Sequence, residues 1–137
     1  PATLRRQRQM CIRDRHGIIH HRKLYLKTGG ANLRGADHLE YTGAPGEIPN
    51  LAVIRFHLHP KVTAAMLANG SVLMKIRGSR VGWNFKADGA IAEIDNSVYF
   101  EDGVRQSSQQ IVLKAVINDI RTTGSHEVRW AFSRGTQ

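Results

Sequence analysis

Hydrophobic and polar residues alternate along most of the chain from residue 16 onward, and this period of two predicts β-strands. The segment Val53–Pro60 shows the alternation most clearly. Its apolar positions are Ile54, Phe56 and Leu58, and its polar positions are Arg55, His57 and His59. We interpret it as a half-buried strand with a basic, imidazole-bearing outer face, and Pro60 is expected to end it.

Further segments of the same kind follow one another at short spacing. They cover residues 18–27, 38–41, 51–59, 62–67, 71–77, 81–86, 91–94, 97–100, 109–120 and 128–132. Turn-forming residues separate them, notably Gly29-Gly30, Asn69-Gly70, Asp88-Gly89 and Glu101-Asp102-Gly103. About nine short strands joined by such turns predict an all-β fold, an antiparallel β-sandwich without a long helix.

Two parts of the chain have features beyond simple alternation. Asn69-Gly70 predicts a tight hairpin, because both central residues of a type I′ turn have positive φ. Residues 109–120 combine features of a strand and of a helix. Their β-branched content favours the strand, whose apolar positions are Ile111, Leu113, Ala115 and Ile117.

Size and composition fit one domain. A chain of 137 residues can bury a core without disulfides or metal, and the single cysteine, Cys11, excludes an intramolecular disulfide. A disulfide-free domain is compatible with the periplasm and with the cytosol. No apolar run approaches the roughly 20 residues of a membrane-spanning helix, so we expect no membrane partner.

The formal net charge of +9 is unevenly distributed. The first 15 residues hold five arginines against one aspartate, whereas later lysines and arginines mostly alternate with apolar residues, as on a solvated sheet face. No basic stripe interleaved with aromatic residues is present, so we expect no nucleic-acid partner for the folded part. Nucleic-acid binding through the basic leader is a separate alternative.

Residues 1–15 differ from the rest of the chain in pattern as well as in charge. They have neither strand alternation nor the apolar core of a secretory signal. The segment Arg6–Asp14 resembles the conceptual translation of a sequencing-adapter fragment. We therefore expect residues 1–15 to be a disordered or artefactual leader, residues 16–137 to form the β-sandwich region, and the natural polypeptide to extend upstream.

The sequence holds no established catalytic constellation. A serine-nucleophile elbow, a phosphate-binding glycine loop, a Rossmann fingerprint and a Cys/His zinc pattern are all absent from it. His57 and His59 share a strand face at a spacing that permits a shared metal ion if another strand supplies a third ligand. The candidates for that ligand are His20, His21 and His38. A structural or exposed role is the more frequent one, and we assign no catalytic and no metal-ligating residue.

Aromatic and basic residues suggest where a sugar could bind. Most aromatic rings fall on the apolar side of their strands and are expected in the core, among them Phe56, Trp83, Phe85, Tyr99, Trp130 and Phe132. Tyr25 and Tyr41 lie on polar faces. Cations that could contact an anionic ligand, or simply solvate a sheet face, are Arg22, Lys23, Lys75, Arg77 and Lys86.

An ordered succession of short motifs runs through the chain. They are His21-Arg22-Lys23-Leu24-Tyr25-Leu26, Asn32-Leu33-Arg34-Gly35-Ala36-Asp37, Ile54-Arg55-Phe56-His57-Leu58-His59-Pro60, Ser97-Val98-Tyr99-Phe100 and Gln109-Gln110-Ile111-Val112. This succession resembles the C-terminal β-sheet region of the heparinase II/III-like polysaccharide lyases, in particular alphaproteobacterial members. The resemblance covers residues 16 to about 135. Each motif is unspecific alone, and the specificity comes from their order.

The resemblance implies a larger parent protein, in which an α/α toroid precedes the β-sandwich and the polysaccharide binds between them. Such lyases cleave uronic-acid-containing polysaccharides by β-elimination, in which the uronate carboxylate is neutralised, a Tyr or His removes the C5 proton and a Tyr-type acid protonates the leaving oxygen. The family's catalytic Tyr and His and its His/Asp metal-binding set lie upstream of the matching region. The resemblance thus implies no cofactor in this fragment, a divalent metal only in the upstream part, and a periplasmic parent.

The leading hypothesis is therefore the C-terminal β-sandwich part of a heparinase II/III-like lyase, which supports the fold and forms one wall of the cleft but has no turnover by itself. The alternative is a stand-alone carbohydrate-binding β-sandwich. In both cases the expected partner is an acidic polysaccharide. The residues expected to contact it are Tyr25, Arg55, His57 and His59.

Overall fold

The computed structural model describes residues 4–13, 17–43 and 45–135, with side chains for the last two ranges. One helical turn, α1 (Ile120–Thr123), accompanies the strands in this part of the chain. The strands are β1 (Leu4–Arg13), β2 (Ile18–Lys27), β3 (Asn32–Tyr41), β4 (Leu51–His57), β5 (Val62–Met66), β6 (Val72–Ile76), β7 (Gly82–Asp88), β8 (Ile91–Glu101), β9 (Val104–Val116) and β10 (Ser125–Arg134). No helix of the described ranges has the length and apolar character needed to span a membrane.

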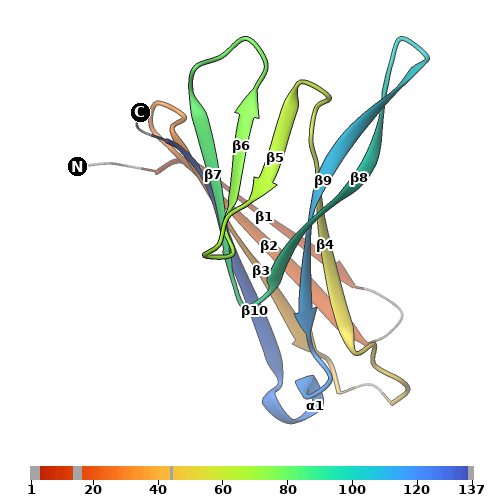
Figure 1. Cartoon of the computed structure of the whole chain (residues 1–137). Helices are drawn as coiled ribbons and strands as arrows, with labels where there is room; N and C mark the ends of the chain where they lie inside the picture. The colour runs from red at the N-terminus through yellow and green to blue at the C-terminus, as the bar shows by residue number, and fades with distance from the viewer. Residues whose placement is uncertain (1–3, 14–16, 44, 136–137) are drawn as a thin grey trace.

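The strands form two antiparallel sheets packed face to face (Figure 1). The large sheet has the order β1-β2-β3-β10-β7-β6-β5, and the small sheet has the order β4-β9-β8. The predicted fold class, an antiparallel β-sandwich without a long helix, is confirmed. Because seven strands face three, the small sheet covers only part of the inner face of the large one.

Several strands are longer than the alternation predicts. β3 already begins at Asn32, although Arg34 and Gly35 interrupt its hydrophobic pattern. β8 is continuous, since Asp95 and Asn96 keep their register with β9 where the sequence pattern predicts a break. Residues 109–116 are strand, as predicted, and the chain leaves the small sheet before α1.

The hairpin predicted at Asn69-Gly70 forms between β5 and β6, but its turn type differs from the prediction. Gly70 has a φ of 86°, whereas Asn69 does not have a positive φ, so the turn is not type I′. The Asn69 side chain instead accepts hydrogen bonds from the backbone N–H and the hydroxyl of Ser71. Two successive positive φ angles occur at Asp102 and Gly103 between β8 and β9, and also at Gly29 and Gly30 between β2 and β3.

The leader is part of a sheet in this structure. Leu4–Arg13 forms β1 and pairs antiparallel with β2, which corrects the expectation that residues 1–15 lie outside the fold. Without β1, the outer edge of β2 would present unpaired main-chain groups, and an extended segment of almost any sequence can pair with such an edge. Residues 1–3 and 14–16 lie outside the described ranges, and the adapter origin of the leader stays a prediction.

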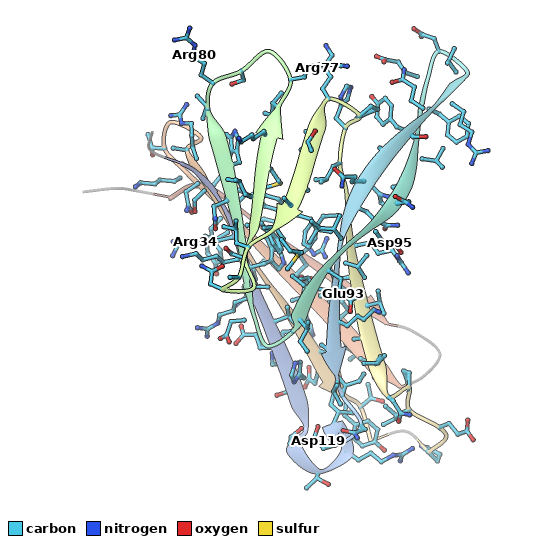
Figure 2. The ribbon with its side chains drawn as sticks, in the orientation of Figure 1. Arg34, Arg77, Arg80, Glu93, Asp95 and Asp119 are labelled. Carbon is cyan, nitrogen blue, oxygen red and sulfur yellow. The ribbon has the colours of Figure 1, made fainter. Side chains whose placement is uncertain are left out.

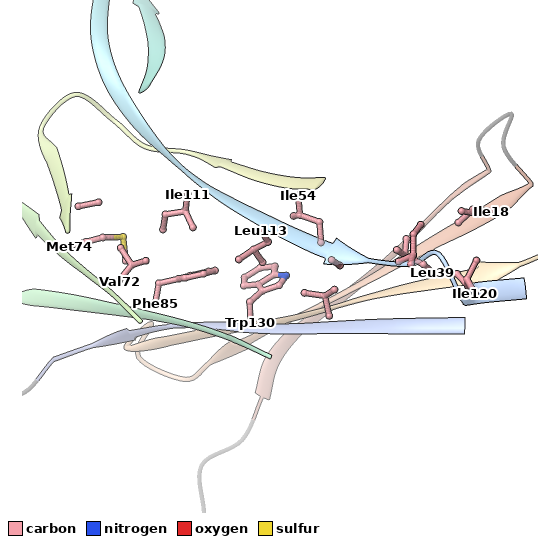
Figure 3. Close-up of a cluster of buried hydrophobic side chains, with 14 residues drawn as sticks. Ile18, Leu39, Ile54, Val72, Met74, Phe85, Ile111, Leu113, Ile120 and Trp130 are labelled. Atoms are coloured by element: carbon pink, nitrogen blue, oxygen red, sulfur yellow. The ribbon is translucent and has the colours of Figure 1, made fainter. Parts of the chain in front are cut away.

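Aromatic rings fill the middle of the sandwich. Phe56 from the small sheet packs against Phe85, Trp130 and Phe132 from the large sheet, with ring centroids 4.7–5.6 Å apart. Figure 3 shows Phe85 and Trp130 between the sheets together with aliphatic side chains. The predicted core role of these rings is confirmed. Tyr99 is an exception, because its ring contacts His59 instead.

A buried carboxylate lies next to this aromatic cluster. The side chain of Asp37 is fully buried, and three side chains donate hydrogen bonds to it. His20 Nε2 lies 2.6 Å from Oδ1, Arg22 Nε 2.7 Å from Oδ1, and Trp130 Nε1 2.7 Å from Oδ2. Gly35 makes this arrangement possible, because a Cβ at that position would lie only 2.1 Å from the Trp130 ring.

The surroundings of Asp37 determine its charge. Burial raises the pKa of this carboxyl, but the hydrogen bonds that it accepts and the positive charge of Arg22 together outweigh burial and hold the pKa below its ordinary value of 3.8. Asp37 is therefore ionised at neutral pH. Arg22 also lies about 6 Å from the ring centroids of Phe56 and Trp130, so the ion pair is packed against the aromatic cluster.

We predict that Asp37→Asn lowers the free energy of unfolding by about 3 kcal/mol at pH 7, because the donors lose their ionised partner inside the protein. Since the folded pKa is depressed, the wild-type contribution is present above about pH 4 and is lost as the pH falls through the folded pKa. Urea unfolding between pH 7 and pH 2 measures both effects. Glu93→Gln, which breaks an exposed pair with Lys114, is the matched control and should cost less than about 1 kcal/mol. An equal effect of both variants would contradict this prediction.

Candidate functional site

The residues expected to contact substrate do not form one site. Arg55 and His57 lie on the outer face of the small sheet, and their polar atoms bond within that sheet. Arg55 Nη1 donates to Gln110 Oε1 at 3.2 Å, and His57 Nδ1 lies 2.7 Å from Ser97 Oγ. Arg55 and His57 are therefore each engaged by a polar side chain of the same sheet.

His59 lies just beyond the end of β4. Its Nδ1 accepts a hydrogen bond from the backbone N–H of Lys61 at 3.1 Å, and its ring centroid is 4.8 Å from that of Tyr99. Both contacts fix the imidazole locally. Tyr25 belongs to the large sheet and faces away from the sandwich, so the structure separates it from the other three candidates.

Tyr25 lies in a groove of about 630 Å³ on the outer face of the large sheet. We call this surface the outer groove, and it crosses β2, β3, β10 and β7. The strand register places its side chains in two adjacent rows. One row consists of Lys23, Ala36, Arg129 and Asp88, and the other of Tyr25, Arg34, Ala131 and Lys86.

Small side chains form the floor of the outer groove. Ala36 on β3 and Ala131 on β10 occupy the two middle strands, so the longer side chains around them rise above the floor. Alternate residues of a strand point to the same face, which is why these positions share one surface. The groove is therefore open and shallow, with charged groups at the ends of the side chains that rise around a mostly apolar lining.

Each of the four strands contributes one cation to the outer groove. These are Lys23 from β2, Arg34 from β3, Arg129 from β10 and Lys86 from β7. All four are exposed. Figure 2 shows Arg34 on the opposite side of the molecule from Glu93 and Asp95, which belong to the small sheet. The four cations of the outer groove thus lie on a different sheet from these two carboxylates.

Two carboxylates border these cations. Glu127 Oε2 accepts a hydrogen bond from Arg129 Nη2 at 3.2 Å, and Asp88 is the register neighbour of Arg129 on β7. The pair is exposed and contributes little to stability. Because such a contact is easily replaced, Arg129 can turn to an anionic ligand without disturbing the fold.

A smaller hollow of about 250 Å³ adjoins the outer groove and shares Lys23 and Glu127 with it. Its other side chains include His21 and His38, whose ring centroids are 6.3 Å apart. His21 Nε2 also lies 3.5 Å from Glu40 Oε2. The hollow extends the polar surface along β2 and β3.

The histidines considered as ligands of one metal ion are distributed over three different surfaces of the fold. His20 bonds to Asp37 on the inner face of the large sheet, His21 and His38 lie on its outer face, and His57 and His59 belong to the other sheet and its following loop. Within residues 17–43 and 45–135, no three His, Cys, Asp or Glu side chains form a group that could hold a metal ion.

The sequence pattern predicted some of the residues that line the outer groove. Tyr25, Lys23 and Lys86 were candidates for ligand contact and lie in it, whereas Arg22 points inward to Asp37. Arg34 and Arg129 were missed. Their alternation with apolar residues gives the correct face of each strand, but the pairing of β3 with β10 joins residues about 95 positions apart and is not readable from a single sequence.

Comparisons with known proteins place this architecture in a family. The family model described as Heparinase II/III-like, C-terminal matches residues 9–131, a range that begins within the leader. FtsZ-localized protein C from Caulobacter vibrioides (strain NA1000 / CB15N) is 34% identical over 125 residues. That alignment covers 86% of this chain and 21% of the relative, so the chain spans about a fifth of the relative's length. This chain belongs to the heparinase II/III-like, C-terminal family.

Proposed function

We propose that this chain is the β-sandwich part of a larger polysaccharide lyase and that it binds an acidic polysaccharide in the outer groove. The observation that carries the proposal is the placement of one cation on each of four adjacent strands, beside Tyr25 and above an alanine floor. Family membership supports the relation to polysaccharide lyases.

The shape of the outer groove suits an extended polyanion better than a single small anion. Neighbouring strands are about 4.8 Å apart, so four strands distribute their cations over roughly 14 Å. Arg34 and Arg129 can each hold a carboxylate or sulfate with two parallel hydrogen bonds, and Lys23 and Lys86 act as point charges. The half-buried ring of Tyr25 offers a flat surface next to them.

The small, uncharged side chains of the groove floor also contribute to the proposed binding. Ala36 and Ala131 leave room for the backbone of a sugar chain to approach the sheet, and the groove then places acidic substituents beside exposed guanidinium and ammonium groups. Such contacts are long-range and screened by salt, so affinity should fall as ionic strength rises. This electrostatic binding requires no catalytic group.

We predict that the double variant Arg34→Ala/Lys86→Ala weakens binding of an alginate or heparan sulfate oligosaccharide about tenfold or more, since two of the four cations are removed. Titration calorimetry at low and moderate salt measures the affinity and its salt dependence. Arg55→Ala is the matched control, because it removes a cation from the small sheet. If the Arg55→Ala control lost binding and the double variant kept it, the binding site would have to be assigned to the small sheet.

The chemistry of β-elimination is proposed to reside in other parts of the parent protein. His20 Nε2 lies 2.6 Å from Asp37 Oδ1, but Asp37 is fully buried in the core and does not face a bound polysaccharide. His57 and His59 lie apart from Tyr25, on the small sheet and in the loop that follows β4. In this proposal the sandwich supports the fold of the parent protein and binds the acidic polysaccharide.

We predict that the isolated chain binds acidic polysaccharide but releases no unsaturated product. The assay follows the ultraviolet absorbance of the unsaturated uronate in mixtures with alginate and with heparan sulfate. Because catalysis is assigned to residues outside this chain, product formation that Tyr25→Phe abolishes would refute the assignment and make Tyr25 the first candidate for the acid or base.

The name of the relative favours a second function. FtsZ-localized protein C is similar to this chain over 86% of its length, so we propose binding to FtsZ as the second candidate. We predict co-sedimentation of the chain with FtsZ polymers if that function is shared. The double variant Arg34→Ala/Lys86→Ala distinguishes an interaction through the outer groove from one elsewhere. Absence of the wild-type chain from the pellet at micromolar concentrations would remove this candidate.

A further inference from the structure

Strand β4 forms an open edge of the small sheet. Among the described strands it pairs with β9 alone. The main-chain groups of its even-numbered residues face β9. This follows from two hydrogen bonds, in which Leu58 N–H donates to Gln109 O and Ile117 N–H donates to Asn50 O. Because the pairing alternates, the main-chain groups of Leu51, Val53 and Arg55 point to the open side.

This edge lacks most of the features that protect sheet edges from pairing. Leu51 and Val53 are both 45% exposed, and neighbouring Val116 is 56% exposed. Exposed edges usually carry charges, proline or a cover, whereas only Arg55 is charged along β4. Strand β5, at the edge of the large sheet, has such a cover, because the side chain of Gln109 bonds to both the N–H and the C=O of Ala64.

A hollow of about 290 Å³ runs along the open edge of β4. Its floor is the inner face of the large sheet, represented by Ile18, His20 and Leu39, and Leu51–Ile54 form its side. In Figure 1 the first half of β4 is drawn beside the start of β2 and the end of β3, which supply Ile18 and Leu39 to the hollow. Apolar side chains from one face of an added strand would fill the hollow, and the strand itself would cover β2.

The unequal sheets and the family relation point to the source of such a strand. Seven strands face three, and part of the inner face of β2 is left uncovered: the side chain of His20, which lines the hollow, is 28% exposed. The chain corresponds to 21% of the length of its relative and belongs to a family described as C-terminal, so most of a parent polypeptide lies outside it. A segment from that part is covalently tied to the sandwich and has a high effective concentration at the edge.

We infer that the open edge of β4 accepts one more β-strand from the part of the parent polypeptide outside this chain. The accepted segment is extended and alternates in polarity, with apolar side chains at every second position facing Ile18 and Leu39. Its main chain bonds to Leu51, Val53 and Arg55, and it widens the small sheet over β2. This surface lies on the opposite side of the large sheet from the outer groove and does not depend on glycan binding.

Hydrogen exchange read residue by residue tests this inference. In the isolated chain, the amides of Leu51 and Val53 should exchange fast, while those of Ala52 and Ile54, which face β9, are protected. In the complete parent protein, the odd-numbered amides should exchange at least about 100-fold more slowly, because they gain main-chain acceptors. The even-numbered amides serve as the internal control and should stay protected in both proteins.

Three results would overturn the inference. The first is fast exchange of the odd-numbered amides in the parent protein as well. The second is protection in the isolated chain that rises with protein concentration, which would assign the edge to a second copy of the chain. The third is slow exchange of odd and even amides alike in the isolated chain at low concentration. None of these results bears on the outer groove, whose affinity is measured separately.

Discussion

The buried ion pair between Asp37 and Arg22 is the interaction on which the arrangement of the sandwich depends. A carboxylate removed from water is costly unless donors surround it, and here His20 and Trp130 supply two of them. These donors come from β2 and β10, the two strands beside β3. The network therefore fixes the relative position of three strands as well as satisfying one charge.

The same network connects the polar and aromatic parts of the core. The Trp130 indole bonds to Asp37 and packs on Phe56 from the opposite sheet, and the guanidinium of Arg22 lies close to both rings. Gly35 leaves the space that the indole occupies. A change at any of these positions should disturb both the strand register of the large sheet and the packing between the sheets, because the contacts share the same side chains.

Strand register also builds the outer groove on the reverse side of the network. The pairings that bring Trp130 next to Gly35 on the inner face bring Arg129 next to Ala36 on the outer face. Since side chains alternate, an ordered core on one side of a sheet imposes an ordered row of side chains on the other. The core packing thus fixes the strand positions from which the cationic side chains of the groove project. Contacts between those side chains are not needed for this.

The sequence by itself determined the fold class, most strands and the face on which most side chains lie, because these follow from local alternation and turn chemistry. It identified Tyr25, Lys23 and Lys86, but it also assigned Arg22 to a surface role. Only the tertiary structure decided that Arg22 and His20 turn inward to a buried Asp37, that Tyr25 is separated from Arg55, and that Arg34 and Arg129 join the groove. Strand order and register cause these differences, since they depend on pairing between distant segments that no local pattern encodes.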